Sequence, residues 1–221
     1  MTREAYHQAI RSLEEEVMHM GKMAGEAVIM SVEALKTRDL EASRRIIEND
    51  LNINRLRFDI EERCLLLIAT QQPMARDLRT LAAILSVITD IERIADHAEG
   101  NAKISIMIGS SCLVKPLLDI PRMAEKAVSM LQRCLRAFIE RDAKTALLIC
   151  DEDDVVDELY NQVYKELLLL MIENSRIIEG ATYLIWAAHN LERIADRVTN
   201  IAERVVFMVT GKMQEINVSK Y

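Results

Sequence analysis

Apolar residues recur every three or four positions along most of the chain, for example at Ile10, Leu13 and Val17. This spacing places them on one face of an α-helix and is typical of amphipathic helices. Polar or helix-breaking residues interrupt the pattern at a few places. Together they predict six helices with approximate ranges 3–36, 40–72, 73–108, 116–140, 143–175 and a last helix that ends near Gly211.

The pattern is duplicated. The string Glu-Arg-Ile-Ala-Asp occurs at 92–96 and again at 192–196, each time after a long apolar run. Further matches support a repeat, since Arg38-Asp39 corresponds to Arg141-Asp142. We therefore expect an all-α protein of six long helices, arranged as two repeated antiparallel three-helix bundles with residues 1–112 and 113–221. A fully extended coiled coil is disfavoured because the breaks come about every 30 to 35 residues.

Composition agrees with a helical protein. Of the 221 residues, 50% are apolar and only 4% aromatic, with six Gly and three Pro. The net charge of −7, without a basic patch or tail, argues against nucleic acid as the main partner. The sequence has no phosphate-cradling Gly loop, nucleophile elbow or Cys/His pairing, so no catalytic residue is proposed and an enzyme is not supported.

The cysteines and the first residues of the chain indicate the cellular compartment in which the protein is expected. Cys64, Cys112, Cys134 and Cys150 lie far apart without a Cys-x-x-Cys pair, so we expect buried free thiols in a reducing compartment. The first residues are charged and do not resemble a signal peptide, and no uncharged run approaches the ~20 residues of a membrane span. The expected location is cytoplasmic, and peripheral membrane contact stays open.

Acidic residues flank the apolar face of both strings. In the last helix Glu192 and Asp196 share one stripe, as Glu92 and Asp96 do in the first copy. Acids four apart on a helix repel each other by a few tenths of a kcal/mol, so another group should offset that cost. The preceding helix of each half carries a matching pair, Asp153 and Asp157 in the second half and Asp50 and Asn54 in the first.

If neighbouring helices are antiparallel, these pairs face the strings and the oxygen atoms converge. Carboxylates at close range cannot all stay ionised without a cation or several hydrogen-bond donors. Oxygen ligands suit hard ions such as Mg, Ca, Mn or ferric iron. Asn54 replaces an acid by an amide, so the site of the first half should be the weaker one.

Two other interpretations remain open at this point. The acids could pair with the neighbouring arginines on a solvated face of a metal-free structural bundle. A carboxylate-bridged redox protein would use Glu4-x-x-His7 and Glu16-x-x-His19. That chemistry needs the two motifs on facing helices, whereas both lie in the first predicted helix, so the redox reading is disfavoured.

Several stretches together resemble the PhoU family, phosphate-transport accessory and regulatory proteins of bacteria. They are Gln71-Gln72-Pro73-Met74-Ala75-Arg76-Asp77-Leu78-Arg79, the two strings in their contexts DIERIADHAEG and NLERIADRVTNIAERVVFMVTG, and the duplicated three-helix layout. The resemblance covers essentially the whole chain. It departs locally at Asn54, where the family usually carries an acid, and at Asn101, where an Ile is usual.

The resemblance implies a non-catalytic cytoplasmic adaptor. It would link a phosphate ABC transporter to a sensor histidine kinase, repress phosphate-starvation genes and phosphate uptake, form a homodimer, and bind a metal ion or multinuclear cluster of iron or zinc. Carried over by position, the metal ligands would be Asp50, Asn54, Glu92 and Asp96 in one half and Asp153, Asp157, Glu192, Asp196 and Asn200 in the other.

Overall fold

The structure, a computed structural model, describes residues 2–213 and contains helices linked by short connections. The helices are α1 (Arg3–Thr37), α2 (Leu40–Gln71), α3 (Arg76–Ile108), α4 (Asp119–Glu140), α5 (Ala143–Asp151), α6 (Asp153–Glu173) and α7 (Ile178–Thr210), with a 3₁₀ turn η1 (Ser175–Ile177) before α7. The all-α prediction is confirmed.

The first connection of each half is built in the same way. Arg38 ends α1 and Arg141 ends α4, both in the left-handed region at φ 59°. The next residue caps the following helix, since the Asp39 carboxylate accepts from the backbone N–H of Glu41 and Ala42. The Asp142 carboxylate does the same for α5. Side-chain caps satisfy N–H groups that have no partner within the helix, so the duplicated Arg-Asp pairs work as stop and start signals.

Two predicted helix starts were wrong by three residues. Pro73 was expected in the first turn of the third helix, but α3 begins at Arg76. Gln72 and Ala75 both have φ 48°, so the backbone turns twice around Pro73 before the helix starts. Likewise, the fourth helix begins at Asp119 instead of residue 116, and it is Pro121 that lies in its first turn, where proline is tolerated.

The predicted fifth helix is two helices, α5 and α6, that meet at Glu152. The carboxylate of Glu152 is bound by Lys126 and by both terminal nitrogens of Arg133, at 2.7 and 2.6 Å. These contacts lower the pKa of Glu152 to about 2, with the Arg133 hydrogen bonds as the main cause. Contacts with α4 therefore accompany the break, and no proline or glycine marks it in the sequence.

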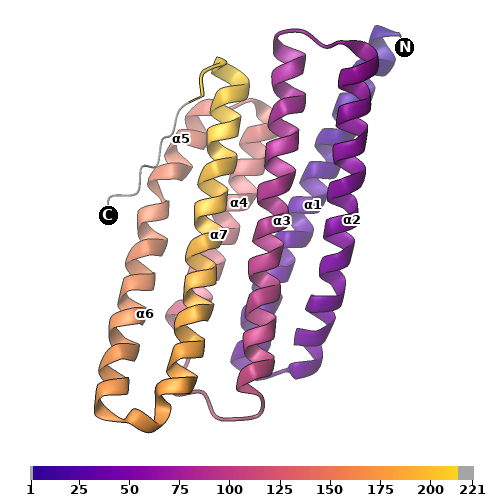
Figure 1. Cartoon of the computed structure of the whole chain (residues 1–221). Helices are drawn as coiled ribbons and strands as arrows, with labels where there is room; N and C mark the ends of the chain where they lie inside the picture. Colours follow the sequence, from indigo (N-terminus) through magenta and orange to yellow (C-terminus); the bar gives the residue numbers. More distant parts are fainter. Residues whose placement is uncertain (1, 214–221) are drawn as a thin grey trace.

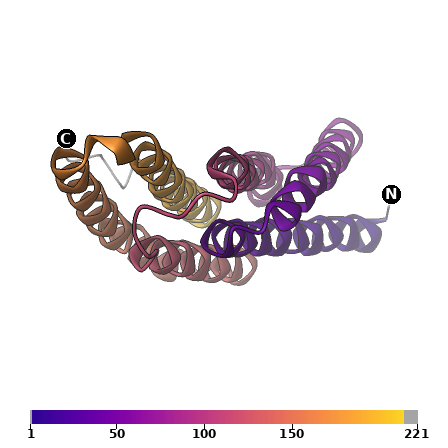
Figure 2. The ribbon, with the colours of Figure 1, turned by 90° about the horizontal axis from the view of Figure 1, so that it is seen from below.

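The helices form two layers. Helices α2, α3, α7 and α6 lie side by side in front, and α1 and α4 lie behind them (Figures 1 and 2). The central helices α3 and α7 run antiparallel, so the α2–α3 turn and the α6–α7 turn lie at opposite ends (Figure 1). Helix α2 is thus one outer edge of the front layer, and α6 is the other.

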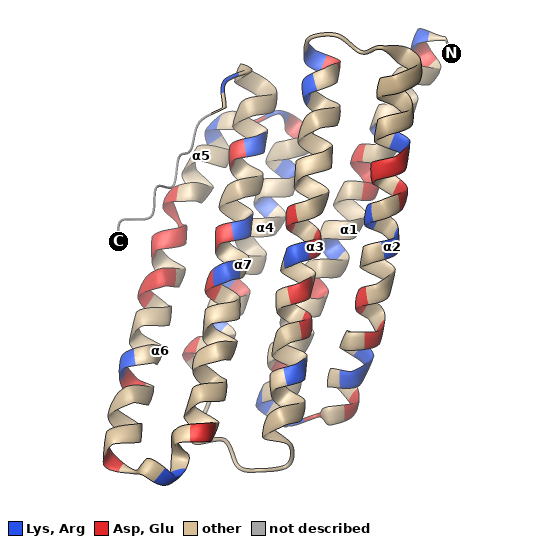
Figure 3. Ribbon diagram, in the orientation of Figure 1, with Lys and Arg blue, Asp and Glu red and all other residues tan. Residues whose placement is uncertain are grey.

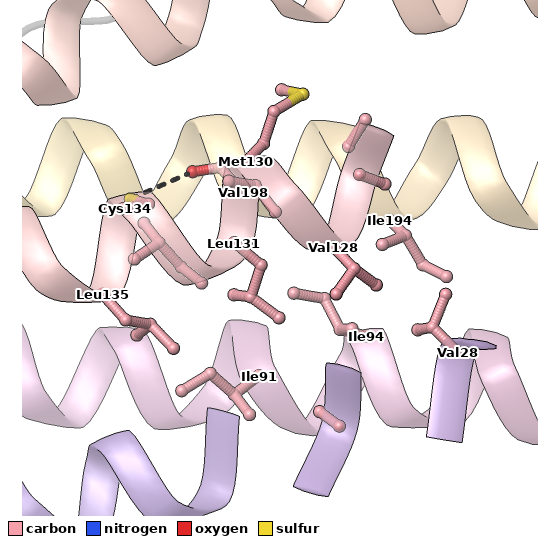
Figure 4. Packing of buried hydrophobic residues seen from close by; sticks show 14 of the residues in the cluster. Val28, Ile91, Ile94, Val128, Met130, Leu131, Cys134, Leu135, Ile194 and Val198 are labelled. Carbon is pink, nitrogen blue, oxygen red and sulfur yellow. Dashed lines mark hydrogen bonds between the residues drawn. The ribbon is translucent and has the colours of Figure 1, made fainter. Parts of the chain in front are cut away.

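One hydrophobic core runs through both halves. Ile94 of α3, Ile194 of α7 and Leu131 of α4 are fully buried and lie close together at the junction (Figure 4). Burying such a side chain contributes about 1.5–3 kcal/mol. The thiol of Cys134 lies 3.8 Å from the carbonyl oxygen of Val198, to which it donates a hydrogen bond. The two repeats therefore share their packing.

The four cysteines are free, as expected, but only three are buried. Cys112 is exposed because it lies in the irregular segment between α3 and α4. Within residues 2–213, no helix has the length and apolar character needed to cross a membrane.

Helices α1 and α4 of the rear layer approach each other closely. A Cβ atom added to Gly21 would overlap the side chain of Leu135, which is itself 2% exposed. A Cβ added to Gly25, one turn further along α1, would make ordinary contact at 3.4 Å with Val128. The close approach of the two helices therefore needs a glycine at position 21 more than at position 25.

Gly21→Ala should lower the free energy of unfolding by about 1–2 kcal/mol, because Leu135 must leave its position in a packed core. Gly25→Ala is the matched control and should be neutral or raise stability by up to about 1 kcal/mol, since alanine favours the helix. Urea unfolding followed by circular dichroism measures both. Equal effects of the two substitutions would contradict the packing argument.

Candidate metal centres in the two halves

In the first half, α2 and α3 bring the predicted residues together. Asp50 and Asn54 follow each other by one turn on α2, and the Asn54 Nδ2 donates to the Asp50 Oδ2 at 2.8 Å. Glu92 and Asp96 of α3 lie close enough to act electrostatically on Asp50. All four positions expected in this half therefore belong to one cluster.

Asp50 is the centre of the first cluster. Only 9% of the residue is exposed, and the pKa of its carboxyl is raised to about 6 with burial as the largest cause. The carboxylates of Asp96, Glu99 and Glu92 contribute to this rise, while the Asn54 hydrogen bond opposes it. Burial also raises the pKa of Glu92 and of Asp96. A negative charge on Asp50 is costly here, and a cation would remove that cost.

Two buried oxygen atoms of this cluster can serve as ligands. Among the described residues, neither the Asp50 Oδ1 nor the Asn54 Oδ1 has a hydrogen-bond partner. A buried acceptor without a partner costs roughly 1–3 kcal/mol. In donor type and charge the first cluster therefore fits a hard cation.

In the second half, Asp157 of α6 faces Glu192 and Asp196 of α7. The pKa of Asp157 is raised to about 6, mainly by burial and also by the charges of Glu192 and Asp196. The predicted antiparallel placement is therefore correct for these three carboxylates. Asp153 lies at the start of α6, one turn before Asp157, and is 2% exposed. Burial raises the pKa of the Cys150 thiol, and the charges of Glu203 and Asp153 add to this rise.

Asn200 needs a correction. The resemblance placed it with Glu192 and Asp196, but its Nδ2 lies 3.4 Å from the Asp90 Oδ1 of α3 and donates to it. Asn200 follows Asp196 by four residues on α7, which rotates its side chain by about 40° relative to that of Asp196. The rotation turns Asn200 toward α3. It is not part of the second cluster.

The acids also have protein partners. Asp196 pairs with Arg193 at 3.1 Å, and the Glu192 carboxylate lies 2.7 Å from the His189 Nδ1. Among the residues that the structure describes, no three His, Cys, Asp or Glu side chains stand close enough together to hold a metal ion. Figure 3 shows acidic and basic residues following each other along α3 and α7. The clusters therefore have the donor types for a metal, and their side chains would have to converge to hold one.

A polar network that the sequence analysis does not predict lies between α3 and α7. Asp90 pairs with Arg197 at 3.7 Å. Burial raises the pKa of Asp90, whereas its hydrogen bond with Asn200 and the charge of Arg197 lower it. At the matching place of the other copy, the Asn190 Oδ1 lies 3.4 Å from the His97 Nδ1. Burial lowers the pKa of His97.

The signal for this network is present in the sequence. Asp90 and Asn190 both stand two residues before the string, and His97 and Arg197 both stand one residue after it. In an antiparallel contact between two copies of one helix, such positions meet pairwise. The Asn190 Nδ2 also donates to the Oδ1 of Asn101 at 2.9 Å.

Comparisons with known proteins agree with this duplicated layout. A family model described as "PhoU domain" matches residues 17–105 and again 120–205. The chain belongs to the PhoU family. One PhoU domain lies within each of the two proposed halves, and the two candidate clusters lie one in each domain.

Relatives of the PhoU family match over nearly their full length. The phosphate-specific transport system accessory protein PhoU homolog of Clostridium acetobutylicum is 34% identical over 218 residues, which are 98% of this chain and 100% of the relative. The homolog of Aquifex aeolicus is 35% identical over 204 residues, 92% of each chain.

Solved PhoU structures show the same fold. The crystal structure of the phosphate transport system regulatory protein PhoU from Streptococcus pneumoniae superposes with a TM-score of 0.89 at 30% identity, covering 95% of this chain and 99% of that one. PhoU from Pseudomonas aeruginosa gives 0.88 at 32% identity, covering 96% and 100%.

Asp50→Asn should stabilise the metal-free protein by about 1–2 kcal/mol at neutral pH. The native pKa of about 6 lies above the unfolded value of 3.8, so the native state binds the proton more tightly. The wild type therefore loses stability as the pH rises through about 6, and the gain from the substitution should vanish below the unfolded pKa. Urea unfolding with a chelator at several pH values measures this.

Asp59→Asn, on the exposed side of the same helix, is the control and should change stability by less than about 0.5 kcal/mol at every pH. If Asp50→Asn destabilised the protein equally at low and neutral pH, Asp50 would not be a carboxylate that resists ionisation.

Proposed function

We propose that this protein is a regulatory adaptor of a phosphate transport system and not an enzyme. The observation that carries the proposal is that both of its domains match PhoU, in one chain of the same length and fold as the PhoU proteins compared above. Those relatives are named as accessory or regulatory proteins of phosphate transport. The adaptor would be cytoplasmic and homodimeric, with peripheral contact to the membrane that holds the transporter.

In this role the adaptor contacts a phosphate ABC transporter and a sensor histidine kinase. When phosphate is plentiful, it represses phosphate-starvation genes and limits phosphate uptake. Long helices packed side by side suit such a task because they offer extended surfaces held rigidly by one continuous core. Binding partners, instead of a reacting substrate, would use these surfaces.

A metal ion or multinuclear cluster, iron or zinc by resemblance and Mg, Mn or Ca by donor type, is part of the proposal. In the first half Asp50, Asn54, Glu92 and Asp96 would hold it. In the second half Asp157, Glu192 and Asp196 would do so, with Asp153 close by. When bound, the metal supplies positive charge that neutralises the carboxylates. The residues of this chain orient the oxygen ligands from two adjacent helices.

A metal-free adaptor is the second candidate. It is favoured by the ion pair of Asp196 with Arg193 and by the spacing of the described acidic side chains, which is too wide for a metal ion as they stand. In this case the acidic faces would be charged docking surfaces. The redox alternative gains no support, since Glu4, His7, Glu16 and His19 all lie in α1.

Elemental analysis of the purified protein separates the two candidates. We expect bound iron or zinc, and we expect Asp157→Asn and Asp50→Asn each to lower the metal content, because each removes a charged oxygen ligand from one cluster. Glu158→Gln, at an exposed position of α6, should leave the content unchanged. Metal-free wild-type protein that binds the transporter and the kinase with unchanged affinity would support the metal-free adaptor.

Deleting the gene tests the regulatory role. Cells grown in plentiful phosphate should then express phosphate-starvation genes and take up more phosphate, and the wild-type gene should restore repression. Transcript levels and uptake of labelled phosphate measure the two effects. Unchanged expression and uptake after deletion would remove the proposed function, whatever the metal content of the protein.

A further inference from the structure

The outer side of α2 carries a stripe of large apolar side chains that the core does not use. Leu51, Phe58 and Leu65 are 58%, 59% and 52% exposed. They are seven residues apart, so they follow one line of about 21 Å along the helix. Each stands two residues before a buried one, Ile53, Ile60 and Leu67, and therefore points away from the core. We call Leu51, Arg55, Phe58, Glu62 and Leu65 the outer stripe.

The fold itself does not require these apolar side chains. By the repeat that aligns Asp50 with Asp153, the positions of Leu51, Phe58 and Leu65 correspond to Asp154, Asn161 and Leu168 of α6. Two of the three are polar in the second half, in the same helix of the same bundle. Exposed apolar side chains gathered on one line, where the duplicated fold accepts polar ones, are typical of an interaction surface.

Two charges lie within the outer stripe with opposite signs on either side of Phe58. Arg55 stands between Leu51 and Phe58, and Glu62 stands between Phe58 and Leu65. Both are exposed, and within residues 2–213 neither has an ion-pair partner. They are separated by seven residues, or about 10.5 Å along the axis, so they do not pair with each other. The Arg57 guanidinium lies 4.9 Å from the centre of the Phe58 ring.

The outer stripe is complementary to itself when a second copy runs antiparallel. With a two-fold axis at Phe58, the two phenylalanines meet and Leu51 faces the partner's Leu65. Arg55 lies within one residue, or about 1.5 Å along the axis, of the level of the partner's Glu62. The symmetry repeats each of the last two contacts. In a parallel arrangement in the same register, Arg55 and the partner's Glu62 would stand about 10.5 Å apart along the axis and would not pair. Self-complementarity around one axis is what a two-fold interface requires.

The position of α2 leaves room for the partner. It is an outer helix of the front layer, and among the described elements it packs only on α1 and α3 (Figures 1 and 2). We infer that the outer stripe of α2 is the surface through which two copies of this chain pair antiparallel. The inference deepens the homodimer of the proposed function by assigning its surface, and it does not depend on bound metal.

Charge exchange tests the register. Arg55→Glu and Glu62→Arg each create two like-charge contacts, so each should raise the dissociation constant of the dimer at least roughly tenfold, or by about 1.4 kcal/mol. The double variant Arg55→Glu/Glu62→Arg restores opposite charges and should return to within a few-fold of the wild-type value. Analytical ultracentrifugation over a range of concentrations, with a chelator present, measures the masses.

Apolar substitutions give a matched control. Leu65→Asn should weaken the dimer, whereas Leu168→Asn, at the repeat-equivalent position of α6, should leave it unchanged. Phe58→Asn introduces the residue type that α6 already carries at Asn161, so the monomer should keep its helical circular dichroism while the dimer is lost.

Cross-linking tests the axis directly and does not depend on the folding of polar variants. In a Cys112→Ser background, which removes the exposed cysteine, Phe58→Cys should form a disulfide-linked dimer under mild oxidation. The same background with Leu168→Cys should stay uncross-linked.

Three results would overturn the inference. They are a wild-type protein that stays monomeric at roughly 100 μM, a double charge variant no tighter than the single ones, and equal cross-linking at both cysteine positions. A monomer would assign the outer stripe to a different partner. The gene-deletion experiment is independent, so loss of the dimer and loss of the regulatory function can be told apart.

Discussion

The close antiparallel contact between α3 and α7 determines most of the structure. Each helix contributes its copy of the string, and Ile94 and Ile194 are fully buried. Polar side chains also cross between the two helices, from Asp90 to Arg197 and from His97 to Asn190. Because one face of each helix is committed to this contact, the acidic face is rotated outward, toward α2 on one side and α6 on the other. The inter-domain packing therefore determines where the two clusters lie.

The two halves have diverged in ways that the common fold makes visible. In the second half Lys126 and Arg133 bind Glu152 where α5 meets α6. The repeat-equivalent residues of the first half, Met23, Met30 and Asn49, line a cavity of about 270 Å³ instead, and α2 continues through this place without a break. An ionic contact in one domain thus corresponds to an open, partly apolar groove in the other.

Local signals were sufficient for most of the fold. The 3.6-residue period and the Arg-Asp pairs predicted the helices and the duplication, because these features depend on neighbouring residues alone. The break at Glu152 was not predictable in this way, since it accompanies tertiary contacts with α4. The helix start at Pro73 was wrongly predicted because Gln72 and Ala75, which have positive φ angles, form a turn around it. A proline is compatible with a helix start but does not exclude a turn.

The candidate site was predictable to the extent that it depends on helix geometry. Antiparallel neighbours were enough to place Asp157 beside Glu192 and Asp50 beside Asp96. Asn200 and the network around Asp90 depend on rotations of tens of degrees about the α7 axis, which a periodic pattern does not resolve. The distances between side chains, which decide whether a metal ion is held, depend on rotamers and follow even less from sequence.

The raised pKa values of Asp50 and Asp157 bear on the kind of signal that the proposed adaptor would carry. Asp50 and Asp157 are each held near pKa 6 by burial and by neighbouring acids, so a cation or a proton bound there changes the charge of one face at little cost. Moving a helix would instead separate side chains of a continuous, close-packed core that joins both domains. Neutralisation of these carboxylates therefore changes the electrostatic potential of the surface first. A partner that binds this surface would respond to that change without any change in the shape of the bundle.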